Sequence, residues 1–102
     1  MIARVWTARA RPDGADAYQS HFREHVRPAL LLVEGCKGAM LLRRPCDDAA
    51  GDTVELIVIS LWTSEDAIRD FSGPDIARSV VGESARKVLT SFDEIVRHFD
   101  VV

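Results

Sequence analysis

Two residues at opposite ends of the chain are suited to acid-base chemistry. His98 is the only histidine in an expected strand, and an imidazole titrates near neutral pH, so His98 could act as a general base. Arg4 keeps its positive charge and could stabilise an anion if its face of the first strand looks inward. The structural alternative stays open, because a histidine near a chain end is more often a hydrogen-bonded structural residue and Arg4 could reach solvent.

Aromatic residues near these two positions could hold a flat substrate. Trp62, Trp6 and Phe71 offer ring faces for stacking, Ser60 offers a hydroxyl donor, and Val58 shares their side of its strand. Tryptophans in a small domain are usually core residues, so both interpretations of the pair remain.

Two further patterns could indicate a metal site. Residues 21–25 spell H-x-x-E-H, but Phe22 marks the buried side of that helix, which places Glu24 in solvent. Cys36 and Cys46 match no metal-ligand spacing and no CxxC pair, so we expect free thiols. We predict no metal and no cofactor.

Composition excludes several classes of protein. The chain has 102 residues, enough for one domain (1–102), and a formal net charge of −3, which argues against a nucleic-acid partner. The longest apolar runs are far shorter than the roughly 20 residues that cross a bilayer. No signal peptide is recognisable at the N-terminus, so we expect a cytoplasmic protein without a membrane partner.

The elements that must position these residues alternate between strand and helix. Residues 2–10 read as a strand, and Asp13 could cap a helix whose apolar stripe includes Ala15, Tyr18, Phe22, Val26 and Ala29. Pro28 predicts a break in this helix, followed by a short continuation to residue 33.

The second half of the chain repeats the alternation. Residues 36–44 and 53–62 read as a hairpin around a polar loop at 45–52, and residues 64–72 as a helix. Further helical pieces are expected within 75–89, and a last strand over 92–102. This order predicts an α+β, ferredoxin-like βαββαβ fold with a four-stranded antiparallel sheet and helices on one face.

The third strand is apolar on both faces, although one monomer's helices can cover only one of them. Ile57, Ile59 and Leu61 occupy the face that the helices would leave bare. A second copy of the sheet, related by a two-fold axis, would bury this face, so we expect a homodimer.

Three stretches form a recognisable combination: VISLWTSEDAI at residues 58–68, EGCKG at 34–38 and VRHF at 96–99. Together they resemble the antibiotic biosynthesis monooxygenase (ABM) domains, a family of small dimeric α+β barrel proteins. The resemblance covers nearly the whole chain. It implies a dimeric α+β barrel and allows activities that include cofactor-free oxygenation and haem degradation.

Carried over by position, Trp62 matches the tryptophan that lines the pocket of anthrone-oxidising members. The asparagine that those enzymes place four positions earlier is Val58 here, and the sequence contains no asparagine. The segment after Phe71 that would offer a haem-ligating histidine contains none, which argues against haem degradation.

Two hypotheses about function follow. One is a cofactor-independent monooxygenase, or a related small enzyme, that acts on an aromatic or polyketide-like molecule with His98 as base and Arg4 as anion stabiliser. The other is a non-catalytic dimeric module that binds a small molecule. An enclosed pocket with a titratable group beside Trp62 would favour the enzyme.

Overall fold

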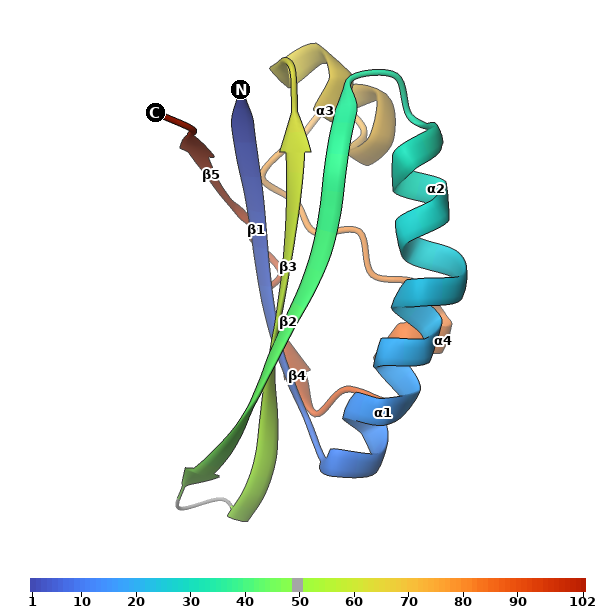
Figure 1. The fold of residues 1–102 in the computed structure, drawn as a ribbon, viewed down its shortest axis with the longest axis vertical. Helices are drawn as coiled ribbons and strands as arrows, with labels where there is room; N and C mark the ends of the chain where they lie inside the picture. The colour runs from blue at the N-terminus through green and yellow to red at the C-terminus, as the bar shows by residue number, and fades with distance from the viewer. Residues whose placement is uncertain (49–50) are drawn as a thin grey trace.

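The computed structural model describes residues 1–48 and 51–102. One antiparallel sheet has β1 (Ile2–Ala10) near its centre, with β3 (Gly51–Trp62) on one side. On its other side lie β4 (Ser91–Phe92) and β5 (Arg97–Asp100), while β2 (Cys36–Asp48) pairs with β3 and forms the edge (Figure 1). The predicted α+β fold with ferredoxin-like strand order is confirmed.

The hairpin is longer than predicted. β2 and β3 pair in register through the segment that we expected to be a loop, with Pro45 opposite Val54 and Cys46 opposite Thr53. The predicted loop over 45–52 was therefore wrong, except for residues 49 and 50, which lie outside the described residues. Pro45 is tolerated because β2 is an edge strand.

The first helical segment is continuous, where the sequence predicted a break. It comprises α1 (Pro12–His21), a π-helical turn η1 (Phe22–Val26) and α2 (Arg27–Leu32). Pro28 cannot donate a backbone hydrogen bond, and a π turn just before it accommodates that loss without ending the helix.

The π turn also changes which residues face the core. Its wider turn shifts the buried stripe by one position, so Leu30 is buried and Ala29 is exposed, which corrects the predicted stripe. The start of the helix differs as well. Arg11 occupies the N-cap and Pro12 the first turn, so Asp13 is not the cap.

The second crossover contains one longer helix and one short one. α3 (Glu65–Ser72) begins where the sequence predicted, because the Ser64 hydroxyl accepts a hydrogen bond from the Ala67 N–H at 3.2 Å. Of the helical pieces expected within 75–89, the structure contains α4 (Glu83–Arg86).

The last strand is divided, where the sequence predicted one strand over 92–102. Between β4 and β5 the chain leaves β1 and pairs instead with the connection after α3. The Ser79 N–H donates to the Glu94 carbonyl at 2.9 Å, and the Val96 N–H donates to the Ala77 carbonyl at 2.7 Å. These two hydrogen bonds hold residues 77–79, in the connection after α3, beside the sheet.

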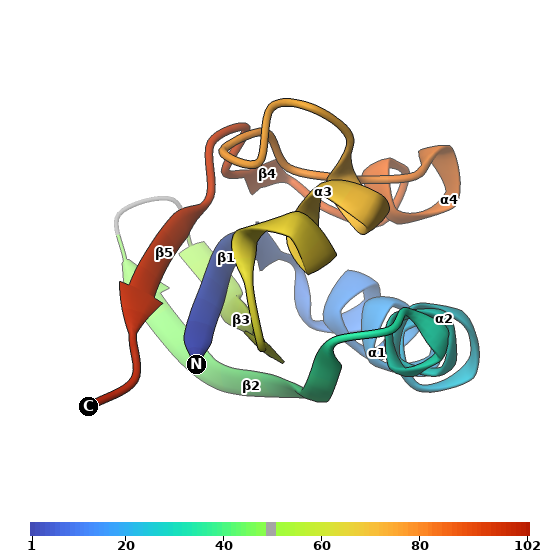
Figure 2. The same ribbon diagram turned by 90° about the horizontal axis from the view of Figure 1, so that it is seen from above.

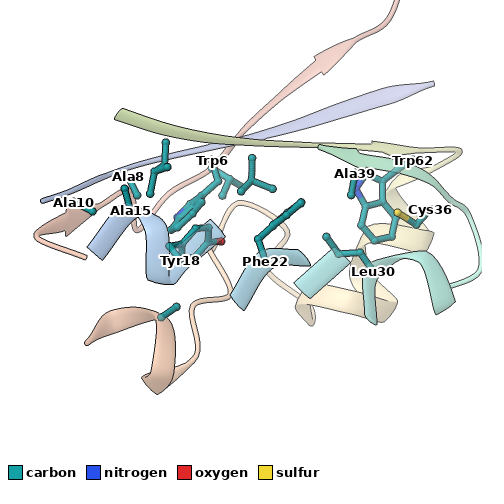
Figure 3. Packing of buried hydrophobic residues seen from close by; sticks show 14 of the residues in the cluster. Trp6, Ala8, Ala10, Ala15, Tyr18, Phe22, Leu30, Cys36, Ala39 and Trp62 are labelled. Atoms are coloured by element: carbon teal, nitrogen blue, oxygen red, sulfur yellow. The ribbon is translucent and has the colours of Figure 1, made fainter. Parts of the chain in front are cut away.

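All helices lie on one face of the sheet, as predicted (Figure 2). Alternate residues of β3 point into the layer between sheet and helices, among them Val58, Ser60 and Trp62, which are buried. The hydrophobic side chains of this layer form the core (Figure 3). No helix within 1–48 and 51–102 is long and apolar enough to span a membrane.

Candidate functional site

A cavity of about 70 Å³ lies within the layer between the sheet and the helices. Strands, the first helix and the second crossover all contribute to its wall, because β1 and β3 turn alternate side chains toward the helices. The lining residues are Arg4, Trp6, Tyr18, His21, Val26, Leu30, Val58, Ser60, Phe71, Val80, Val81, Gly82, Ala85 and Val96.

Arg4 brings a positive charge to this wall. It is 5% exposed, and its guanidinium donates to the Ile76 carbonyl, to the Arg78 carbonyl at 2.8 Å and to His98 Nε2 at 3.0 Å. The Phe71 ring lies 5.8 Å from its Cζ. Burial lowers the pKa of Arg4 to about 10, so it stays charged at neutral pH.

No described carboxylate pairs with Arg4, and none lines the cavity. A buried charge is normally paired, because its desolvation is costly. Neutral carbonyls and a ring face compensate the Arg4 guanidinium only in part. The wall therefore attracts an anion, or a group that becomes anionic.

His98 lies directly opposite Arg4 in the β1–β5 register, and its Nε2 atom accepts the Arg4 N–H. Its pKa is lowered by burial and then by the Arg4 charge, against a smaller opposing effect of Glu65. His98 is therefore neutral at pH 7, with the lone pair on Nε2. It contacts Arg4 but does not line the cavity. From the sequence, His98 was expected to be a base inside the pocket.

Trp62 packs behind the residues that line the cavity. Its side chain is fully buried, its indole N–H donates to Ser60 Oγ at 2.8 Å, and its ring lies 5.7 Å from the Phe71 ring. It does not line the cavity and instead supports two residues that do. Figure 3 shows Trp62 near Cys36, apart from Trp6.

The other expected substrate-binding residues do meet at the cavity. Trp6, Val58, Ser60 and Phe71 all contribute to its lining together with Arg4. The Trp6 indole N–H is already bonded to the Asp93 carbonyl at 3.0 Å, so Trp6 offers a ligand its ring face and no donor.

Sequence reasoning missed two polar residues of the helix wall, Tyr18 and His21. The Tyr18 ring lies 5.7 Å from the Trp6 ring and 5.9 Å from that of His21. Figure 3 shows Tyr18 beside Trp6. Burial raises the pKa of Tyr18, so its hydroxyl keeps its proton. Tyr18 belongs to the predicted apolar stripe, and this signal alone could have placed it against the sheet.

Glu24 and His25 of the H-x-x-E-H segment lie on the exposed side of the helix. Their side chains are 3.9 Å apart, and the His21 ring lies 5.6 Å from the His25 ring and 5.9 Å from the Tyr18 ring. Within 1–48 and 51–102 there is no group of three or more potential ligands. Cys36 and Cys46 are both free thiols.

Comparisons with known proteins identify the family. A crystal structure from Bordetella bronchiseptica, titled "Putative antibiotic biosynthesis monooxygenase", is 20% identical and superposes with a TM-score of 0.57. The match covers 99% of this chain and 96% of that one, which supports the fold. The comparison with curated proteins gave no match. The family model for antibiotic biosynthesis monooxygenase matches residues 1–83, and the chain therefore belongs to the ABM family.

Proposed function

We propose that the protein is a cofactor-independent monooxygenase that binds a hydroxylated aromatic, polyketide-like molecule in the cavity between sheet and helices. One observation carries this proposal: Arg4 is a buried cation with no carboxylate partner among the described residues, on the wall of an aromatic and apolar cavity. Such a wall favours the anion of a phenol or enol over the neutral molecule.

The reaction needs no redox group in the protein if the substrate supplies the electrons. The bound enolate passes one electron to dioxygen, and the two radicals combine to form a C–O bond. Loss of water from the resulting hydroperoxide leaves a carbonyl. A CH₂ group thus becomes C=O, one oxygen atom enters the product, and the other leaves as water.

The proton of the substrate needs an acceptor beside Arg4. His98 is neutral and carries its lone pair on Nε2, where it accepts an Arg4 N–H; an unprotonated nitrogen of this kind is what a general base requires. A substrate hydroxyl that displaces the Arg4 N–H from Nε2 would bring its proton to this lone pair. His21, which lines the cavity itself, is the second candidate base.

One observation favours a different function, a non-catalytic module that binds a small molecule. The His98 lone pair is already occupied by Arg4, and His98 lies outside the lining. If no base reaches the ligand, the cavity would bind an anion without reaction.

Oxygen uptake with phenols and anthrones separates the two functions. Binding is followed by tryptophan fluorescence, since Trp6 lines the cavity. We expect Arg4→Gln to lower kcat/KM about 10- to 100-fold, the effect of one lost charge-assisted hydrogen bond. His98→Ala should lower kcat by about 100-fold or more and leave binding of the same compounds largely intact.

Arg69→Gln is the matched control, because Arg69 is a half-exposed arginine of α3 that pairs with Glu65 and Asp66 away from the cavity. It should leave uptake unchanged. Binding without oxygen consumption by the wild-type protein would reject the oxygenase and leave the binding module. Uptake that is unchanged in His98→Ala would remove His98 from the mechanism.

We further propose that the protein is a cytoplasmic homodimer, built as a dimeric α+β barrel through the uncovered face of the sheet. Ile57, Ile59 and Leu61 point to this face, and Met40 and Leu42 beside them are 43% and 45% exposed. A second sheet packed against this face would remove it from water.

Ile59→Asp tests the dimer. Burial of an isoleucine contributes about 1.5–3 kcal/mol, and a two-fold axis doubles the effect, so dissociation should become about 10²- to 10⁴-fold easier. Leu32→Asp is the control, since Leu32 is 86% exposed on α2. Sedimentation should show a dimer for this control and a monomer for Ile59→Asp. A monomeric wild-type protein would refute the proposal.

A further inference from the structure

We propose that the cavity selects aromatic ligands with oxygen atoms at both ends, one held by Arg4 and Ser60 of the sheet and the other by Tyr18 of the helix wall. This inference rests on the binding site of the proposed function and adds its ligand class. Two structural facts carry it, namely an unpartnered hydroxyl on Tyr18 and a directed hydroxyl on Ser60.

Tyr18 presents a donor without a protein acceptor. Its side chain is 4% exposed and packs on Trp6, yet its hydroxyl bonds to no described residue. Among the described residues, no side-chain polar atom is both sealed from solvent and without a partner. The hydroxyl must therefore retain access to open space, and the cavity that Tyr18 lines provides it.

Ser60 is set as a donor by its neighbour. Its Oγ accepts the Trp62 indole N–H at 2.8 Å, so one lone pair of the hydroxyl oxygen is occupied. The Ser60 proton is left to point elsewhere, and Ser60 lines the cavity beside Arg4. Trp62 is thus a positioning residue that fixes the direction of the Ser60 hydroxyl.

The two walls together define the ligand. The sheet supplies Arg4 and Ser60, the helix supplies Tyr18, and the lining contains no carboxylate to accept a proton from a ligand. A molecule with one oxygen can satisfy only one wall and leaves a donor of the other unpaired. Sites of this kind reject analogues that lack the matching polar atom more strongly than apolar pockets reject a changed size.

Two isosteric probes test the inference, 4-hydroxyacetophenone and 4-ethylphenol. They differ in the carbonyl oxygen opposite the hydroxyl. Binding is measured by titration calorimetry at a pH at which both probes are neutral. The wild-type protein should bind 4-hydroxyacetophenone about tenfold more tightly, the effect of one buried hydrogen bond.

Tyr18→Phe keeps the ring and removes the hydroxyl, and a thermal melt confirms that the variant folds. It should lose the preference for 4-hydroxyacetophenone, so that the variant binds the two probes with about equal affinity. An absent preference in the wild type, or one that persists in Tyr18→Phe, would overturn the inference.

The outcome is separable from the proposed oxygenase. A Tyr18-dependent preference without oxygen uptake from any phenol or anthrone would reject the oxygenase and keep the ligand class. Oxygen uptake with no dependence on Tyr18 or on the second oxygen would keep the oxygenase and reject the ligand class.

Discussion

Replacement of Ser60 by alanine deletes the oxygen that accepts the indole N–H of Trp62. The bond is 2.8 Å long, the two residues are 3% and 0% exposed, and Trp62 does not line the cavity, so bulk water does not reach the indole N–H. A buried donor left without a partner costs about 1–3 kcal/mol. We expect Ser60→Ala to lower the free energy of unfolding by this amount, or Tm by about 4–8 °C per kcal/mol.

A double-mutant cycle isolates the cause. Trp62→Phe removes the indole N–H and keeps an aromatic ring in place. In that background Ser60→Ala leaves no buried donor without a partner, so it should lower the free energy of unfolding by less than about 0.5 kcal/mol. Chemical denaturation of the four proteins gives the coupling energy, which we expect to be about 1–2 kcal/mol. If the two substitutions are additive within about 0.5 kcal/mol, Ser60 does not hold Trp62 and our account of its directed hydroxyl fails.

Two further predictions concern stability. Gly35→Ala should lower the free energy of unfolding by about 2–4 kcal/mol, because Gly35 has φ +95° and a Cβ there would lie 2.5 Å from the Ala67 Cβ. Gly73→Ala should cost about 1 kcal/mol, because Gly73 has φ +90° but no atom within 4 Å of an added Cβ. Equal costs in thermal melts would contradict the predicted clash at Gly35. The lowered pKa of His98 means that its contribution to stability is complete above pH 6.5 and is lost as the pH falls below 6.5 toward its folded pKa. His98→Gln keeps an acceptor for Arg4 but does not titrate. Between pH 7.5 and pH 5, the free energy of unfolding measured with denaturant should therefore fall less for this variant than for the wild type. A difference between the two proteins that stays constant with pH would refute the prediction.

Periodicity predicted the order of elements and the faces of the strands well. The alternation in β3 placed Val58 and Ser60 on the pocket side. In β1 it grouped Arg4 with Trp6 on one face but left open which way that face points, and the structure turns it toward the helices. The departures from the predicted elements have local structural causes, at residues that normally end a helix or a strand. Pro28 was expected to break the first helix before a short continuation, but a π turn accommodates it without a break.

The cavity was predicted in part. Five of its lining residues were expected from a strand face or from stacking chemistry, namely Arg4, Trp6, Val58, Ser60 and Phe71. Trp62 was assigned to the pocket because the family resemblance places a tryptophan there. Its hydrogen bond to Ser60 is a property of three-dimensional packing that spacing does not reveal. The pairing of His98 with Arg4 does not follow from the sequence, because the register of β5 depends on the residues that leave the sheet before it.

The divided last strand has a consequence for how the chain folds during synthesis. β1 is synthesised before the other strands of the sheet but completes its hydrogen bonding only with β4 and β5, more than 80 residues later in the chain. Contacts so distant along the chain form slowly. Until they form, Arg4 lacks both its carbonyl acceptors and His98, and β1 exposes an unpaired strand edge that is prone to aggregate. A nascent chain that stalls before residue 91 would therefore need a chaperone at β1.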